Sequence, residues 1–180
     1  NPYALLGGVT LLLLCLLHGA IFIALKTTGE IRGRARSLVS KAALPTIVVA
    51  AGFLVWTMIM HSGIGHIAWV VGLAGLAALA LVAAVVFNGL GREGLAFTAM
   101  AVTIGAAVTT LFTALFPNVL PSTTGEGTLT VANASSTEYT LGVMMWVAIF
   151  ITPLVIGYQI WTYWVFRRRV SRDHVLASAH

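Results

Sequence analysis

Histidine, cysteine and acidic side chains are the groups in this sequence that could ligate a metal or move a proton. His18 is the only histidine inside a long apolar run, and Cys15 is the only cysteine of the chain. A membrane heme would take an axial ligand such as His18, often with a second ligand from a facing helix, and no second candidate stands at matching depth. We therefore disfavour heme ligation and interpret His18, followed by Gly19 and Ala20, as a polar side chain at a close helix contact. Cys15 is interpreted as a small buried side chain.

The other ionisable groups are predicted to lie outside the membrane-spanning segments. His61 and His66 flank a glycine turn and lack the third ligand that a zinc site needs. Ion pathways and proton relays require ionisable groups inside the bilayer. All five acidic residues fall in predicted loops or beyond the last apolar run: Glu30, Glu93, Glu126, Glu138 and Asp173. The sequence therefore predicts no catalytic residue and no metal ligand on this chain.

The last apolar segment ends in an aromatic cluster formed by Tyr158, Trp161 and Trp164. Tryptophan and tyrosine are enriched where a helix crosses the membrane surface, so we favour an aromatic belt in which Trp161, Tyr163 and Trp164 lie at the inner headgroup level. The alternative is that Tyr158, Trp161 and Trp164 contact a lipid or quinone head group. Aromatic residues expected at the outer level are Tyr3, Trp56, Trp69, Tyr139 and Trp146.

The amino-acid composition indicates the class of protein in which these residues lie. The chain has 180 residues, of which 59% are hydrophobic and only 8% are charged, and its mean hydropathy is +0.97. Soluble domains carry about 25% charged residues, and a core of this size cannot hide so much apolar surface from water. We therefore predict an all-α integral membrane protein. The basic residues are too few and too dispersed for a nucleic-acid-binding surface.

Five apolar runs are long enough to cross a bilayer, which takes about 20 residues. Pro45 is expected near the start of the second helix, whereas Pro153 lies inside the fifth and should kink it. The predicted bundle occupies residues 1–172, with a long outer loop at 117–140 that could include a short hairpin strand, and a polar tail follows at 173–180. The predicted helices are 2–25, 42–60, 66–87, 95–116 and 141–166.

The positions of the cations predict the orientation of this bundle. With five alternating spans, every Lys and Arg falls on one side: within the basic loop 26–41, which could be partly helical, at Arg92, and from Arg167 onward. By the positive-inside bias this side is the cytoplasm. The N-terminus and the loop 117–140 are then outside, and the C-terminus is cytoplasmic. The triple arginine 167–169 is a stop and orientation signal.

Several ordered stretches resemble a known family. They are "NPYALLGGVTLLLLCLLHGAIFIALKTTGEIRGRAR" (1–36), "FPNVLPSTTGEGTLTV" (116–131) and "NASSTEYTLGVMMWVAIFITPLVIGYQIWTYWVF" (133–166). Together they resemble the second half of subunit II of cytochrome bd-type quinol oxidases. Residue 1 is Asn, and no signal-peptide pattern follows it. We therefore expect the chain to begin partway through a longer protein.

The resemblance implies a two-subunit terminal oxidase of the respiratory chain in the bacterial cytoplasmic membrane. Such an enzyme oxidises quinol and reduces dioxygen to water, generating a proton motive force. In this family heme b and heme d belong to the partner subunit I, and subunit II acts as a scaffold for subunit I. The resemblance also implies contact with membrane lipids. Whether a small accessory subunit binds is left open. The acidic residues of its proton route lie in the N-terminal half, which this sequence lacks. No ligand or catalytic residue of the family can be carried onto this chain.

Two rival functions remain at the level of the sequence. A multi-span transporter or permease component would have broken helices around a midplane site, and only Pro153 hints at one. A membrane assembly factor would bind its partner only transiently.

Overall fold

The computed structural model describes residues 2–61, 65–120 and 128–167. Five helices in this described part are long and apolar enough to cross a membrane, which confirms the all-α integral membrane class. They are α1 (Pro2–Lys26), α2 (Gly29–Met60), α3 (Ile67–Gly89), α4 (Glu93–Leu115) and α6 (Glu138–Val165). The chain divides into two compact units, the first running to Ala114 and the second spanning Leu115–Arg168.

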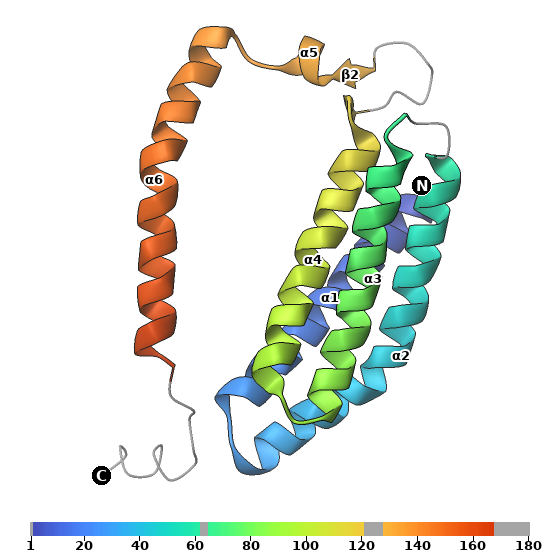
Figure 1. Ribbon diagram of the computed structural model, residues 1–180, viewed down its shortest axis with the longest axis vertical. Coiled ribbons are helices and arrows are strands. Elements are labelled where there is room, and N and C mark those ends of the chain that lie inside the picture. The colour runs from blue at the N-terminus through green and yellow to red at the C-terminus, as the bar shows by residue number, and fades with distance from the viewer. Residues whose placement is uncertain (1, 62–64, 121–127, 168–180) are drawn as a thin grey trace. The chain divides into compact units, whose positions relative to one another are not determined.

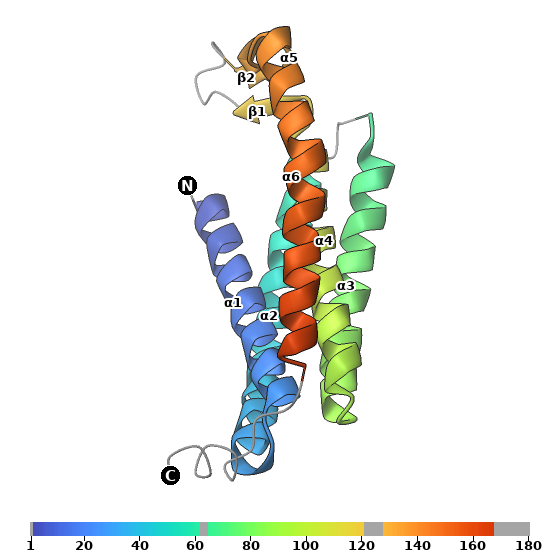
Figure 2. The same cartoon turned by 90° about the vertical axis from the view of Figure 1, so that its left-hand side faces the viewer.

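The first unit is an up-and-down arrangement of α1 to α4 (Figures 1 and 2). The turns that join α1 to α2 and α3 to α4 lie at one end, and the connection from α2 to α3 lies at the other. Each helix buries one narrow stripe at helical spacing; in α1 this stripe includes Thr10, Leu14, Leu17 and Ile21. The remaining faces are apolar and exposed, as expected for helices surrounded by lipid.

Buried threonines in this unit are satisfied within their own helices. The hydroxyl groups of Thr46, Thr57 and Thr110 each donate to the carbonyl oxygen four residues earlier, at 2.7, 2.8 and 2.7 Å. Without water in the bilayer core, a polar side chain that is not hydrogen-bonded would be costly. These bonds let polar residues occupy the packed interior, and Thr57 in addition pairs with Tyr3 of α1.

The second helix is the clearest departure from the sequence prediction. It starts at Gly29, so most of the basic segment 26–41, expected as a loop that could be partly helical, is a continuation of α2. Pro45 consequently lies well inside α2 and not near its start. The buried residues Ala35 and Val39 explain the extension, because they give this polar segment an apolar stripe to pack.

Cys15 lies on the exposed side of α1, so the expectation of a buried side chain is wrong. The buried positions Leu14 and Leu17 define the inner face of α1. A residue next to Leu14 is rotated by about 100° from it, which turns Cys15 outward.

The short connection between α3 and α4 depends on a glycine. Gly91 has a φ of +74°, in the left-handed region that glycine adopts at little cost. Its N–H donates to the carbonyl oxygen of Asn88 at 3.1 Å, and the N–H of Arg92 donates to that of Phe87 at 2.9 Å. This tight turn brings the start of α4 directly beside the end of α3.

The second unit contains a small hairpin and a long helix. Strand β1 (Asn118–Leu120) pairs antiparallel with β2 (Leu129–Thr130), and the one-turn helix α5 (Val131–Ala134) follows. A capping box between Thr130 and Asn133 fixes the start of α5. Helix α6 contains Pro153 and has no buried residue. The tail 173–180, most of the triple arginine and residues 121–127 lie outside the described residues.

Candidate functional site

His18 lies on α1 against α4 and is held by aromatic contact. Its ring stacks on Phe97 with centroids 4.5 Å apart, and Phe22 contacts the same phenyl ring at 5.8 Å. The Nδ1 atom of His18 is buried and has no hydrogen-bond partner in the described part of the chain. The structure thus places His18 at a helix contact, in keeping with the interpretation from sequence.

His61 and His66 are tied to helix ends. Nδ1 of His61 lies 2.9 Å from the carbonyl oxygen of Thr57, and Nε2 of His66 lies 2.7 Å from that of Thr113. A carbonyl oxygen only accepts, so each ring donates an N–H to it. The second bond joins the start of α3 to the end of α4. Over the ranges that the structure describes, no three His, Cys, Asp or Glu side chains come together to hold a metal.

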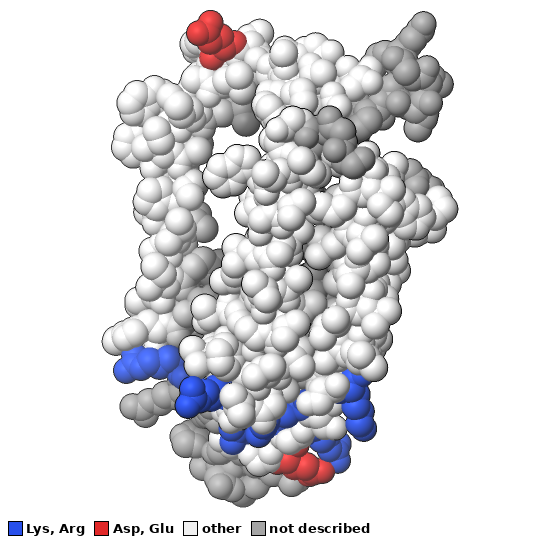
Figure 3. Space-filling view, turned by 45° about the vertical axis from the view of Figure 1, so that its right-hand side comes forward, with Lys and Arg blue, Asp and Glu red and all other residues white. Residues whose placement is uncertain are grey.

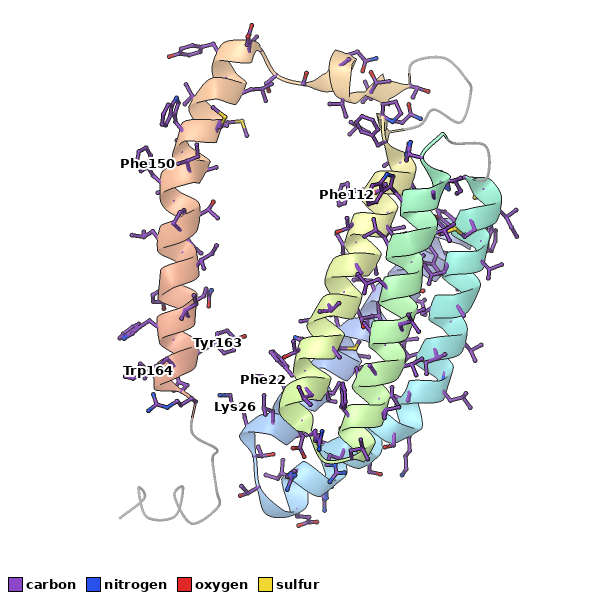
Figure 4. All side chains as sticks on the ribbon, in the orientation of Figure 1. Phe22, Lys26, Phe112, Phe150, Tyr163 and Trp164 are labelled. Atoms are coloured by element: carbon purple, nitrogen blue, oxygen red, sulfur yellow. The ribbon has the colours of Figure 1, made fainter. Side chains whose placement is uncertain are left out.

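The aromatic cluster at the end of α6 contains two separate contacts. Tyr158 and Trp161 have ring centroids 6.3 Å apart, and the guanidinium of Arg167 lies 4.5 Å from the ring centroid of Trp164. Figure 4 shows Tyr163 and Trp164 projecting from opposite sides of the helix. Tyr158, Trp161 and Trp164 are each about 60% exposed. Their apolar rings beside a cation match an interfacial position, where an apolar body meets a charged headgroup layer.

Sequence reasoning missed one site, a buried ion cluster at the basic end of the first unit. Glu93, expected in a loop, is the first residue of α4 and is only 2% exposed. Its Oε1 atom accepts from Nε and Nη2 of Arg32 at 2.8 and 2.6 Å. Arg36 adds a second ion pair, with its Nε 3.9 Å from the same oxygen. The cluster fastens the extension of α2 to the start of α4.

Arg36 also caps the end of α3. Its Nε and Nη2 donate to the carbonyl oxygen of Asn88 at 3.2 and 3.0 Å, and Nη2 donates to that of Gly89 at 3.0 Å. These carbonyls belong to the last turn of α3, where they lack partners within the helix and where a cation is favoured. The amide of Asn88 is fully buried and donates to the carbonyl oxygen of Arg36 at 3.4 Å.

This cluster of Arg32, Arg36 and Glu93 has a structural role. A carboxylate bound to a guanidinium through two N–H groups is held in its charged form and in one geometry. The signal in the sequence was the spacing of Arg32 and Arg36, four residues apart and therefore on one helix face. The spacing of the two arginines does not predict the cluster while residues 26–41 are taken as a loop, because a loop has no fixed face.

A cavity of about 470 Å³ lies between the four helices. Its wall is almost entirely apolar, and small residues create the space. Heme iron takes His, Met, Cys or Tyr as protein ligands, and the wall carries none of these, so it does not fit a heme. The small and polar residues of the wall are Gly7, Gly8, Thr10, Ala50, Ala51, Ala77, Ala78, Thr103 and Ala107.

Comparison with known proteins gives concordant matches. Residues 1–166 match the family described as Cytochrome bd terminal oxidase subunit II. The chain is 38% identical over 175 residues to the cytochrome bd ubiquinol oxidase subunit 2 of Bacillus subtilis (strain 168), covering 95% of this chain and 51% of that protein. It is 28% identical over 211 residues to the cytochrome bd-I ubiquinol oxidase subunit 2 of Escherichia coli (strain K12), covering 100% and 56%. A probable cytochrome oxidase subunit 2 of Haemophilus influenzae is 29% identical over 215 residues.

The chain spans about half the length of the curated relatives it matches. The matches confirm the resemblance seen in residues 1–36 and 116–166, and they do not favour a transporter. On the strength of a match that extends over residues 1–166, the chain belongs to the cytochrome bd terminal oxidase subunit II family.

Proposed function

We propose that this chain is the C-terminal half of subunit II of a quinol-oxidising, dioxygen-reducing terminal oxidase, and that it scaffolds a heme-bearing subunit I. The observation that carries the proposal is the family match over residues 1–166, together with relatives named as subunits of ubiquinol oxidases. Hemes b and d are assigned to the partner subunit. The chain acts on the reaction only by supporting that partner.

The exposed apolar surface of α6 supports a scaffolding role. No described residue of this helix is buried, and residues such as Phe150 and Leu154 are 69% and 70% exposed. A helix of this composition needs lipid or other helices around it. In the proposed complex these are membrane lipids, the missing half of subunit II and subunit I, with a small accessory subunit left open.

The proposed location is the bacterial cytoplasmic membrane, with the basic end of the first unit in the cytoplasm and segment 117–140 outside. The cation distribution supports this orientation. Single cysteines introduced in a Cys15→Ala background test it. Thr137→Cys should react with a membrane-impermeant thiol reagent in intact cells, whereas Ser40→Cys should react only after the cells are permeabilised. The reverse pattern would overturn the orientation.

The enzymatic proposal is tested on the complete protein purified from the membrane. We expect it to co-purify at fixed stoichiometry with a heme-bearing subunit and to show heme absorbance and quinol-dependent oxygen uptake. Substrate flux in liposomes by a heme-free preparation would contradict the proposal. Loss of the partner on mild purification, with activity retained by the partner alone, would instead indicate an assembly factor.

The assignment of hemes away from this chain is tested with His18→Ala. We expect the heme spectrum of the assembled complex to stay unchanged, because the His18 ring is stacked on Phe97. His66→Ala serves as a control for removing a histidine that bonds to a backbone carbonyl oxygen. Loss of one heme signal in His18→Ala alone, at normal subunit stoichiometry, would show that this residue is a ligand.

A contact of Tyr158, Trp161 and Trp164 with a lipid or quinone head group remains a separate proposal. It is supported by their clustering beside Arg167 at the end of α6. Replacing Trp161 and Trp164 by Leu should reduce the lipid or quinone retained after purification. Trp146→Leu is the matched control, since Trp146 is equally exposed in the same helix. Equal retention of lipid and quinone in all variants would contradict the proposal.

A further inference from the structure

The basic end of the first unit carries more cations than its acids can neutralise. The described residues up to Ala114 include six Lys or Arg and two Glu, which gives a net charge of +4. Figure 3 shows basic side chains gathered at this end. Arg32 and Arg36 are committed to Glu93 and to the end of α3. Arg34 and Lys41 of α2 take part in neither of these contacts.

The extension of α2 has two different faces. The inner face carries Arg32, Ala35, Arg36 and Val39, at the spacing i, i+3, i+4 and i+7 that defines one side of a helix. Ala35 is 8% exposed and Val39 is fully buried. The residues just out of phase with this stripe form the outer face: Ile31, Arg34, Leu38 and Lys41.

The outer face combines exposed cations with exposed apolar residues. Ile31 and Leu38 are 59% and 58% exposed, and the Arg34 side chain is 79% exposed. Lys41 is also exposed, and it has no hydrogen-bond or ion-pair partner in the part of the chain that the structure describes. Basic residues next to the membrane end of a spanning helix attract the anionic lipids of the adjacent leaflet.

A shallow groove runs along this face, between the two cations. Gly33 and Ser37, four residues apart, provide small side chains between Arg34 and Lys41, and a Cβ added at Gly33 would meet no atom within 4 Å. We define the α2 groove by the residues that line it: Glu30, Gly33, Arg34, Ser37, Leu38 and Lys41.

The groove begins at the membrane surface and extends slightly beyond the headgroup layer. Lys41 directly precedes the apolar part of α2, and Arg34 lies seven residues before it, about 10 Å along the helix axis. The polar layer on each side of the hydrocarbon core is about 5–8 Å thick. Lys and Arg side chains are long enough to reach along the helix to a common point over Ser37.

We propose that the α2 groove binds the phosphodiester head group of an anionic phospholipid of the surrounding bilayer. Arg34 and Lys41 contact the phosphate, and Leu38, which lies between them on the groove, contacts the apolar part of the lipid nearest the head group. Arg34 pairs with Glu30 at 2.5 Å, but both side chains are more than 70% exposed. Such an exposed pair is weak, so a phosphate can replace the carboxylate as the partner of Arg34.

The test uses the complete protein purified in detergent and titrated with dioctanoyl phosphatidylglycerol, with dioctanoyl phosphatidylcholine and inorganic phosphate as comparisons. Bound lipid is counted by native mass spectrometry. We expect phosphatidylglycerol to bind most tightly. The double variant Arg34→Gln, Lys41→Gln should weaken this binding by about 10- to 30-fold. Arg92→Gln, which removes an exposed cation from the same end outside the groove, should have little effect.

A steric variant separates the groove from general attraction by charge. Gly33→Leu keeps every cation and adds bulk to the groove at a position where a Cβ meets no atom within 4 Å, so it should also reduce phosphatidylglycerol binding. Equal binding of the two lipids, equal binding of free phosphate, or equal loss in Arg92→Gln would overturn the proposal. Loss of a co-purified protein subunit in the Arg34, Lys41 double variant would also overturn it, because the face would then be a protein contact.

Discussion

The two ends of the first unit are held by different physics. At the basic end, Arg32 and Arg36 of α2 join α4 and α3 through a buried carboxylate and backbone carbonyls. At the opposite end, α1 and α2 are joined by contacts between uncharged side chains. Tyr3 of α1 bonds to Thr57 of α2 at 3.0 Å and stacks on Phe53 at 5.2 Å.

This difference shows where the helix pairs are fastened together. The uncharged contacts link neighbours in sequence, α1 with α2 and, through His66, α3 with α4. The ion cluster instead links the α1–α2 pair to the α3–α4 pair. The core supports it from the same half, where His18 of α1 stacks on Phe97 of α4. The apolar cavity lies toward the other half, where small residues line the space between the helices.

The largest expected effect is at the ion cluster. Glu93→Ala removes the shared carboxylate and leaves two guanidinium groups facing each other without an acid. We expect a loss of about 3 kcal/mol in the free energy of unfolding, at the low end for a buried pair because the Arg32 side chain is 34% exposed. Equilibrium unfolding of the complete protein in mixed micelles measures it.

Glu30→Gln is the matched control, since Glu30 forms an exposed pair with Arg34 in the same helix. Exposed pairs contribute about 0–1 kcal/mol, so this variant should unfold nearly as the parent does. Similar losses in both variants would show that burial of Glu93 does not matter, and the contrast between the two ends would fail.

A smaller effect is expected where α1 approaches α2 at the uncharged end. A Cβ at Gly7 would lie 3.0 Å from the Phe53 ring, whereas one at Gly8 would meet nothing within 4 Å. Gly7→Ala should therefore be less stable than Gly8→Ala by about 1–2 kcal/mol, because it overpacks a close contact. Thermal unfolding of the two variants side by side measures the difference. Equal stabilities would mean that this contact is loose.

The smallest effect is expected from a single hydrogen bond. Tyr3→Phe removes the hydroxyl that pairs with Thr57 and keeps the ring against Phe53. We expect a loss of about 1 kcal/mol, since Thr57 still donates to its own helix. A loss as large as that of Glu93→Ala would show that the uncharged end is the main fastening point.

The sequence by itself determined the class of the protein, the existence of five spanning helices and the family. These follow from hydropathy over about 20 residues and from ordered motifs, both of which are local along the chain. A helix contact at His18 could also be expected, because the small residues Gly19 and Ala20 follow it and let a neighbouring helix approach closely.

Only the tertiary structure decided that α2 begins at Gly29, that Glu93 is buried and that Cys15 faces outward. A polar segment such as 26–41 reads as a loop until a neighbouring surface covers its inner stripe. A carboxylate in a turn is exposed by default, and it becomes buried only when cations from a distant segment reach it. Both outcomes depend on contacts across about 60 residues of sequence, which local pattern does not contain.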